Sequence, residues 1–184
     1  MEQNDFRFAA VSEDEWRELR GVWLDMSAAQ PSDDVETIED ASGLTQSQWR
    51  ARAKALTGLD CFAEALIDAG GRWLGFVCGY FDDLARDRHA FVSHLYARHG
   101  DLETEALLLE RVAAWAGLHG AEAVVVGIGE DRHDLLARFE DHGFRRSGVR
   151  RRLDVDPSRF EVELVFDLAA SALAAQPHVS LRSA

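Results

Sequence analysis

Apolar residues recur at helical spacing in the first part of the chain. Ser12 and Glu15 form a capping box, a pairing of side chains and backbone N–H groups that marks helix starts. The apolar residues that follow at intervals of three and four are Trp16, Leu19, Trp23 and Met26. This spacing predicts a helix that buries one face and ends near Ser27, after a short strand over residues 6–11.

A polar stretch separates this helix from a second one. Residues 28–43 lack a regular apolar pattern, and we expect a loop there. Thr45 and Gln48 supply another capping box, and Trp49 and Ala53 follow at helical spacing. A short helix is therefore expected after the loop.

The rest of the chain alternates between strand and helix patterns. Short apolar runs bounded by turn residues predict strands, and longer runs with helical spacing predict helices that end at Gly120 and Gly143. The predicted strands are residues 61–68, 72–80, 90–96, 121–128, 145–154 and 159–168, and the predicted helices are residues 102–119 and 131–142. The continuously apolar run at 121–128 is typical of a strand at the centre of a sheet.

These elements predict an α/β fold with a central mixed, mostly antiparallel sheet of about seven strands flanked by about four helices. A length of 184 residues suits one domain, which we place at residues 1–168. Residues 169–184 are rich in alanine and serine and have no apolar pattern, so a flexible C-terminal tail is expected.

The net charge of the chain limits the classes of partner that we expect it to bind. The formal net charge is −13, from 33 acidic and 20 basic residues. This field repels nucleic-acid backbones and anionic membrane surfaces, so neither is expected as a partner, and it favours a cationic or amine-bearing substrate. Residues 1–8 do not resemble a targeting segment and no apolar run reaches membrane-spanning length, so a cytoplasmic location is expected. The preference for arginine over lysine suggests a bacterial source with a GC-rich genome.

Six short segments carry a resemblance to a known family. They are Glu18–Arg20, Trp49–Arg52, Gly75–Gly79, Val112–Ala116, Glu140–Phe144 and Asp156–Ser158. In this order and at this spacing they resemble bacterial proteins of the GNAT N-acetyltransferase superfamily, across nearly the whole chain. The resemblance implies the GNAT fold, acetyl-CoA or another acyl-CoA as the cofactor, a small amine as the substrate, and a homodimer as in many relatives.

The segment that would hold the cofactor's pyrophosphate departs from the family pattern. In the family, a loop of pattern Gln/Arg-x-x-Gly-x-Gly/Ala offers backbone N–H groups at a helix start to the phosphates. Aligned on Trp115, this loop falls on Gly100–Glu105, with Glu103 and Glu105 in place of the glycines. Acids there are expected to repel a diphosphate and to fill its space. By family position the cofactor-binding residues are Leu95, Tyr96, Ala97, Glu103, Thr104, Glu105, Ala106, Arg132 and Phe139.

Two other family positions are changed. The asparagine that usually opens the helix after the fifth strand falls on Arg132, and the tyrosine that commonly protonates the leaving thiolate falls on Phe139, whose ring cannot donate a proton. The resemblance implies a divergent N-acyltransferase that transfers an acetyl or acyl group from acyl-CoA to a small amine. The alternative is a GNAT-fold protein that no longer uses acetyl-CoA, either a repurposed enzyme, for example in natural-product tailoring, or a ligand-binding or interaction module. Whether the chain is an enzyme is open on sequence alone.

His94 and Tyr96 are the candidate catalytic residues. Strict alternation would put both on the sheet face of Ala90 and Val92, where family enzymes often present a base. His94 would then act as the base and Tyr96 as a replacement acid. The alternatives are a histidine bonded to a neighbouring element and a tyrosine ring packed against a helix.

Three acids are candidates for binding the amine. Glu64 lies in an apolar run and must either have a partner or face solvent. Asp82 and Asp83 follow a strand near the expected entrance for the acceptor, although ordinary turn acids have the same appearance. Histidines and acids occur near one another, but without His-x-x-x-His or Cys-x-x-Cys spacing, and no metal is expected. The arginines over residues 145–152 either meet an anionic partner or balance local charge.

Overall fold

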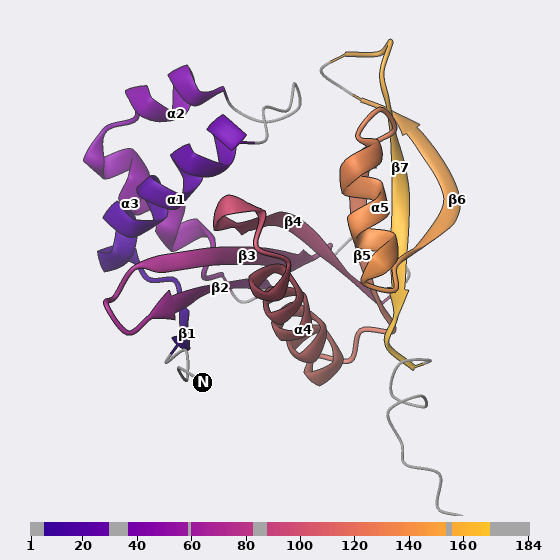
Figure 1. The fold of residues 1–184 in the computed structure, drawn as a ribbon, viewed down its shortest axis with the longest axis horizontal. Helices are drawn as coiled ribbons and strands as arrows, with labels where there is room; N and C mark the ends of the chain where they lie inside the picture. Colours follow the sequence, from indigo (N-terminus) through magenta and orange to yellow (C-terminus); the bar gives the residue numbers. More distant parts are fainter. Residues whose placement is uncertain (1–5, 30–36, 59, 83–87, 154–155, 170–184) are drawn as a thin grey trace, which may run out of the picture.

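Seven strands form one sheet in the order β1-β2-β3-β4-β5-β7-β6 (Figure 1). The computed structural model describes residues 6–29, 37–58, 60–82, 88–153 and 156–169. The strands are β1 (Phe6–Ala10), β2 (Cys61–Asp68), β3 (Trp73–Phe81), β4 (His89–Ala97), β5 (Ala123–Gly129), β6 (Arg145–Arg152) and β7 (Phe160–Asp167). Neighbouring strands are antiparallel except β4 and β5, which are parallel. The predicted fold class, an α/β fold on a mostly antiparallel sheet, is confirmed.

Helices cover both faces of this sheet. They are α1 (Trp16–Ala29), α2 (Ile38–Gly43), α3 (Gln46–Ala55), α4 (Leu102–Leu118) and α5 (His133–Asp141). α1 and α3 share one buried cluster with β2 and β3, whereas α4 and α5 share another with β4, β5 and β7. Figure 1 shows α1, α2 and α3 gathered over the β1–β4 half of the sheet, and α5 beside β5, β6 and β7.

Local signals in the sequence fix most helix starts. The backbone N–H of Ser12 donates to Glu15 at 3.0 Å, and that of Thr45 donates to Gln48 at 2.8 Å, so both capping boxes form. The loop predicted over residues 28–43 was wrong in part, because it contains α2. The side chain of Thr37 accepts from the N–H of Asp40 at 3.2 Å and starts this helix of six residues, too short for an apolar period to show.

Two glycines in β3 let α4 lie close against the sheet. A Cβ atom at Gly75 would stand 2.5 Å from the carbonyl oxygen of Tyr96 and 3.0 Å from side chains of α4. A Cβ atom at Gly79 would stand 3.0 Å from Val112. Any side chain at Gly75 would push away either β4 or the start of α4.

Parts of the chain lie outside the described residues. These parts include Asp83 and residues 170–184, where nearly all of the predicted tail falls. Of the helices that the structure describes, none combines the length and the apolar character needed to cross a membrane.

Candidate functional site

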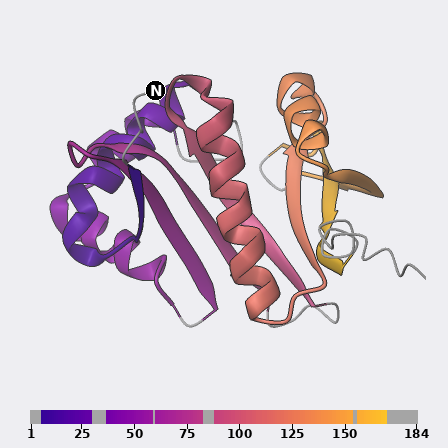
Figure 2. The same cartoon turned by 60° about the horizontal axis from the view of Figure 1, so that its bottom comes forward.

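β4 and β5 pair over only part of their lengths. Their parallel register joins His89, Ala90 and Phe91 to Ala123, Val124 and Val125 in that order. Beyond Phe91, the strand pairing described for β4 is with β3 alone. Figure 2 shows the two strands moving apart beside α4. We call this place the β4–β5 divergence; here the β5-facing backbone of β4 is open to another bonding partner.

A β-bulge lies at the same point of β4. The register with β3 shifts so that Val92 is opposite Gly79 and His94 is opposite Cys78, which leaves Ser93 as the extra residue. A bulge changes which face the following side chains occupy. Ala90 and Val92 belong to the cluster under α4 and α5, but Tyr96 belongs to the cluster under α1 and α3.

The prediction that His94 and Tyr96 share a face with Ala90 and Val92 was therefore wrong. It assumed unbroken alternation, and the bulge at Ser93 interrupts that alternation. Sequence alone gives no direct signal for this bulge, because Ser93 looks like any other polar residue in a strand.

The ring of His94 packs against aromatic rings on the α1 side of the sheet. Its centroid lies 4.4 Å from that of Trp23 and 6.4 Å from that of Phe76. Nδ1 lies 3.1 Å from the hydroxyl oxygen of Ser93. Burial, aided by the charge of Arg52, lowers the pKa of His94 to about 4, so the ring is neutral at pH 7.

Tyr96 and its neighbours line the same stretch of β4. The ring of Tyr96 is buried in the α1–α3 cluster, which matches the packing alternative, and burial raises the pKa of its phenol. Leu95 packs against the opposite cluster, under α4. Ala97 is buried at the end of the strand.

The start of α4 is capped by its own chain. Asp101 is the N-cap residue, and its carboxylate accepts from the N–H groups of Glu103 and Thr104, each at 3.4 Å. The hydroxyl of Thr104 donates to the same carboxylate at 2.6 Å. Asp101 thus takes the place in which an external anion would bind at a helix start.

Glu105 connects α4 to α5. Its side chain is 4% exposed, and its oxygens lie 3.4 Å from Nη1 of Arg138 and 3.4 Å from Nε2 of His142. We call these three residues the α4–α5 clasp. The side chain expected to face the cofactor instead holds two helices together.

These residues do not fit the pyrophosphate of an acyl-CoA. Two N–H groups of the helix start already donate to Asp101, and Glu103 and Glu105 add negative charge to the first turn. Ala106, the next family position, is half-buried. The misfit concerns the diphosphate end of the cofactor only, because the β4–β5 divergence is formed by other residues.

Of the two changed family positions on the α5 side, Phe139 has no polar donor and Arg132 lies beside an acid. Phe139 is 3% exposed and meets Phe144 edge-to-face, with ring centroids 5.1 Å apart. Arg132 is the residue before α5, and its Nε lies 3.8 Å from a carboxylate oxygen of Asp134. Phe139 is therefore a core residue of this half of the molecule.

Glu64 has an arginine partner. Arg111 of α4 donates to both of its carboxylate oxygens, at 2.7 and 2.8 Å, and the guanidinium lies 4.9 Å from the centroid of Phe8. The sequence required a partner or solvent for this acid, and the structure supplies the partner. Asp82 follows the last residue of β3 and is exposed.

A group of side chains that the sequence did not single out lies on the face opposite α4 and α5. Tyr80 and Phe91 stack with centroids 5.5 Å apart, and Phe91 pairs with Val125 where β4 and β5 part. The carboxylate of Glu161 lies directly over Gly127, where a Cβ would collide with it. Burial and the charges of Asp82 and Glu161 raise the pKa of Tyr80. We call Tyr80, Phe91 and Glu161 the acceptor-side group.

A signal for this group was present but weak. Glu161 alternates with apolar residues in the last strand, which indicated a face in contact with water. The topology that inserts β7 beside β5, and so brings Glu161 to the divergence, is not written in any local pattern.

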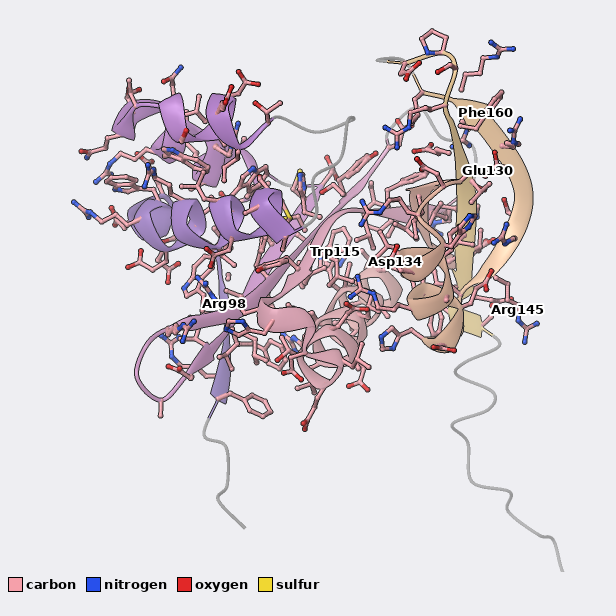
Figure 3. All side chains as sticks on the ribbon, turned by 45° about the horizontal axis from the view of Figure 1, so that its top comes forward. Arg98, Trp115, Glu130, Asp134, Arg145 and Phe160 are labelled. Carbon is pink, nitrogen blue, oxygen red and sulfur yellow. The ribbon has the colours of Figure 1, made fainter. Side chains whose placement is uncertain are left out.

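Three arginines of β6 pair with nearby acids. Arg146 bonds Glu140 at 3.0 Å, Arg150 bonds Glu130 at 2.6 Å, and Arg151 bonds Glu163 at 2.7 Å. Figure 3 shows Arg145 at one end of this strand, and Glu130 and Phe160 toward the other. In the part of the chain that the structure describes, no cluster of three or more His, Cys, Asp or Glu side chains could hold a metal ion.

Comparison with known proteins identifies the fold. No family model and no curated protein matches the sequence. Among solved structures, the chain is similar to a GNAT-family acetyltransferase from Streptococcus pneumoniae, with a TM-score of 0.67 and 14% identity over 89% of this chain and 99% of that one. An N-acetyltransferase from Staphylococcus aureus Mu50 gives a TM-score of 0.68 and 14% identity, with the same coverage.

A third similar structure is a mutant form of the spermidine/spermine N-acetyltransferase SpeG from Vibrio cholerae, with a TM-score of 0.67 and 11% identity over 94% of this chain and all of that one. The agreement extends over nearly the whole of each chain. The predicted GNAT fold is confirmed.

Proposed function

We propose that this chain, which has the fold of the GNAT acetyltransferases, is an N-acyltransferase that moves an acyl group from a thioester to a small amine. The observation that carries the proposal is the β4–β5 divergence, where β4 bulges at Ser93 and leaves β5 after Phe91. A bulge at the point where pairing ends leaves a residue of β4 outside the hydrogen-bond ladder, and a sheet that serves only as a scaffold gains nothing from this loss. Its backbone groups are suited to bond a thioester arm and its carbonyl oxygen.

The reaction has a simple balance. The amine nitrogen attacks the thioester carbonyl carbon, the new C–N bond forms, and the C–S bond breaks. The attacking nitrogen loses a proton, and the departing thiolate gains one. The protein must therefore hold the amine against the carbonyl, accept a proton and stabilise the developing oxyanion.

The acceptor-side group supports a cationic amine as the substrate. The carboxylate of Glu161, whose Oε1 lies 3.9 Å from Nη1 of Arg151, can pair in addition with an ammonium group, and Tyr80 and Phe91 present stacked aromatic rings beside it. The net charge of −13 attracts cations to the whole surface. Asp82, whose charge acts on Tyr80, adds to the local field.

His94 is the proton acceptor in this proposal. Its ring is neutral at pH 7, so one ring nitrogen carries a free lone pair, and it lies next to the bulge that forms the divergence. A pKa near 4 makes it a weak base. It is therefore suited to accept the proton while the C–N bond forms, because the amine nitrogen becomes more acidic at that stage.

A second function is favoured by a separate observation. The α4–α5 clasp and the Asp101 cap leave the start of α4 without a place for a diphosphate. Phe139 also removes the usual proton donor. A GNAT-fold protein that has abandoned acyl-CoA and binds a cationic small molecule through the acceptor-side group would have the same features.

The proposed function is tested by amine-dependent thiol release. The purified protein is mixed with millimolar acetyl-CoA or S-acetylpantetheine and a panel of diamines and polyamines, and free thiol is followed with a chromogenic disulfide. The proposal expects thiol release that depends on both protein and amine. Glu161→Gln should lower kcat/KM for the amine by about tenfold or more, since a charge-assisted contact is lost.

The control removes the same charge from another place. Glu140→Gln on α5 breaks only its pairing with Arg146 and should leave kcat/KM within about twofold. If no amine and no thioester gives turnover, but polyamines raise the melting temperature of the wild type and not of Glu161→Gln, the second function replaces the first.

A further inference from the structure

The N-cap position and the first turn of α4 carry three acidic side chains. Asp101, Glu103 and Glu105 lie within five residues, and α4 is 17 residues long, so its N-terminal dipole is fully developed. Acids in this position stabilise the helix by themselves. They also remove the positive potential that would attract phosphate groups.

Two backbone donors at this helix start are also occupied. Asp101 accepts from the N–H groups of Glu103 and Thr104, and the hydroxyl of Thr104 donates to Asp101 as well. A diphosphate would have to displace a carboxylate that is covalently part of the chain. That internal carboxylate has a large advantage in effective concentration.

Four basic side chains near α4 are engaged with acids of the fold. Arg138 and His142 face Glu105 in the α4–α5 clasp. Arg98, which precedes the helix, pairs with Asp25 and donates to the carbonyl of Trp73 at 2.7 Å. Arg111 is held by Glu64 on both oxygens. These four side chains therefore serve to join elements of the fold.

We propose that the protein recognises its acyl donor through the acyl-pantetheine arm alone and makes no favourable contact with the nucleotide diphosphate of CoA. The inference rests on the proposed function, since it concerns the donor for that same site. The β4–β5 divergence accepts the arm, and the phosphates extend past the acids of α4 into solvent. The donor class is an acyl-pantetheine thioester, with or without a nucleotide attached.

Equilibrium binding separates the two parts of the donor. Isothermal titration is carried out with CoA, with pantetheine and with adenosine 3′,5′-bisphosphate. The expected result is that pantetheine binds at least as tightly as CoA, and that the bisphosphate gives no heat of binding at millimolar concentration. CoA binding tenfold or more tightly than pantetheine overturns the inference and leaves the proposed function standing.

The salt dependence of the Kd for CoA is a second test, because repulsion of the diphosphate and favourable contact with it change this Kd in opposite directions. At about 10 mM ionic strength the screening length is about 30 Å, and the acids of α4 should weaken CoA relative to pantetheine by about two- to tenfold. At about 1 M salt the screening length is about 3 Å, and the two Kd values should agree within about threefold. A diphosphate that the protein binds would show tighter CoA binding at low salt.

A matched variant tests whether these acids cause the difference. Asp101→Asn with Glu103→Gln removes two negative charges while an asparagine still caps the helix. The Kd for pantetheine should stay within about twofold of the wild-type value. The factor by which CoA binds more weakly than pantetheine at low salt should become smaller. Weaker CoA binding by this variant would show that the acids contact the donor and would overturn the inference. No binding of either CoA or pantetheine to the folded wild type overturns the inference and the acyltransferase proposal together.

Discussion

His94 combines a packing role with the chemistry proposed for it. Its ring stacks 4.4 Å from Trp23, and burial holds its pKa at about 4, well below the ordinary 6.5. A histidine that is buried and neutral in the folded protein must be protonated when the chain unfolds at low pH. Stability should therefore depend on the charge of this one residue.

The sign of the dependence follows from the two pKa values. The folded state holds fewer protons than the unfolded state between pH 6.5 and pH 4, so the free energy of unfolding falls as the pH falls through this window. Between pH 7 and pH 5 this residue alone accounts for about 2 kcal/mol. Urea unfolding at both pH values should show this loss in the wild type, and His94→Gln should lose about 2 kcal/mol less. Equal losses in both proteins would mean that the folded protein leaves His94 open to protonation.

The α4–α5 clasp is the main contact between elements that sequence reasoning did not foresee. Glu105 was expected to face a cofactor because its family position does so. Its partners Arg138 and His142 lie 33 and 37 positions further along the chain, at a distance that no local pattern reveals. The clasp should couple the two halves of the sheet, because α4 covers β2, β3 and β4 whereas α5 lies with β5 and β7.

Breaking the clasp should cost more than removing a neighbouring charge. Glu105→Gln leaves Arg138 without its carboxylate partner, and we expect a loss of about 1–3 kcal/mol in the free energy of unfolding. The matched control is Glu103→Gln, an exposed acid in the same turn, with an expected loss of about 0.5 kcal/mol. Both are measured by urea unfolding.

A double-mutant cycle isolates the clasp. Glu105→Gln combined with Arg138→Met should show a coupling energy of about 0.5–3 kcal/mol. Additive effects of the two substitutions would mean that the ion pair makes no net contribution to stability.

Most elements of the fold could be predicted from the sequence, because their signals are local. Capping boxes at Ser12 and Thr45 fixed helix starts, and apolar runs bounded by turn residues predicted all seven strands. The bulge at Ser93 and the insertion of β7 beside β5 are non-local, and they decide where side chains meet. This is why local patterns located the elements, whereas the predicted face of His94 was wrong.

On the scale of the whole molecule, the chain has the GNAT fold, but the start of α4 carries acids at positions where the family pattern has glycines. The sheet order, the parallel β4–β5 pair and the divergence are all present. Close packing of α4 is also preserved, through Gly75 and Gly79. At the start of α4, Asp101 caps the helix, and Glu103 and Glu105 place two further acids in its first turn.

The half of the molecule that would bind the acceptor amine differs from the start of α4. It opens on the side away from α4 and α5, where the acceptor-side group offers a carboxylate and two aromatic rings. The arginines of β6, further along the sheet, are engaged with carboxylates on β7, α5 and the end of β5. This arrangement supports the proposed binding of a cationic amine and of a thioester arm.

Amide hydrogen exchange with and without saturating pantetheine tests this account most directly. The account predicts slower exchange, by about fivefold or more, for amides at residues 92–97 of β4 and 126–129 of β5, because ligand binding suppresses local opening. Residues 101–105 at the start of α4 should be unchanged when CoA replaces pantetheine. Protection that is confined to 101–105, or absent from β4 and β5 while the ligand is bound, would contradict it.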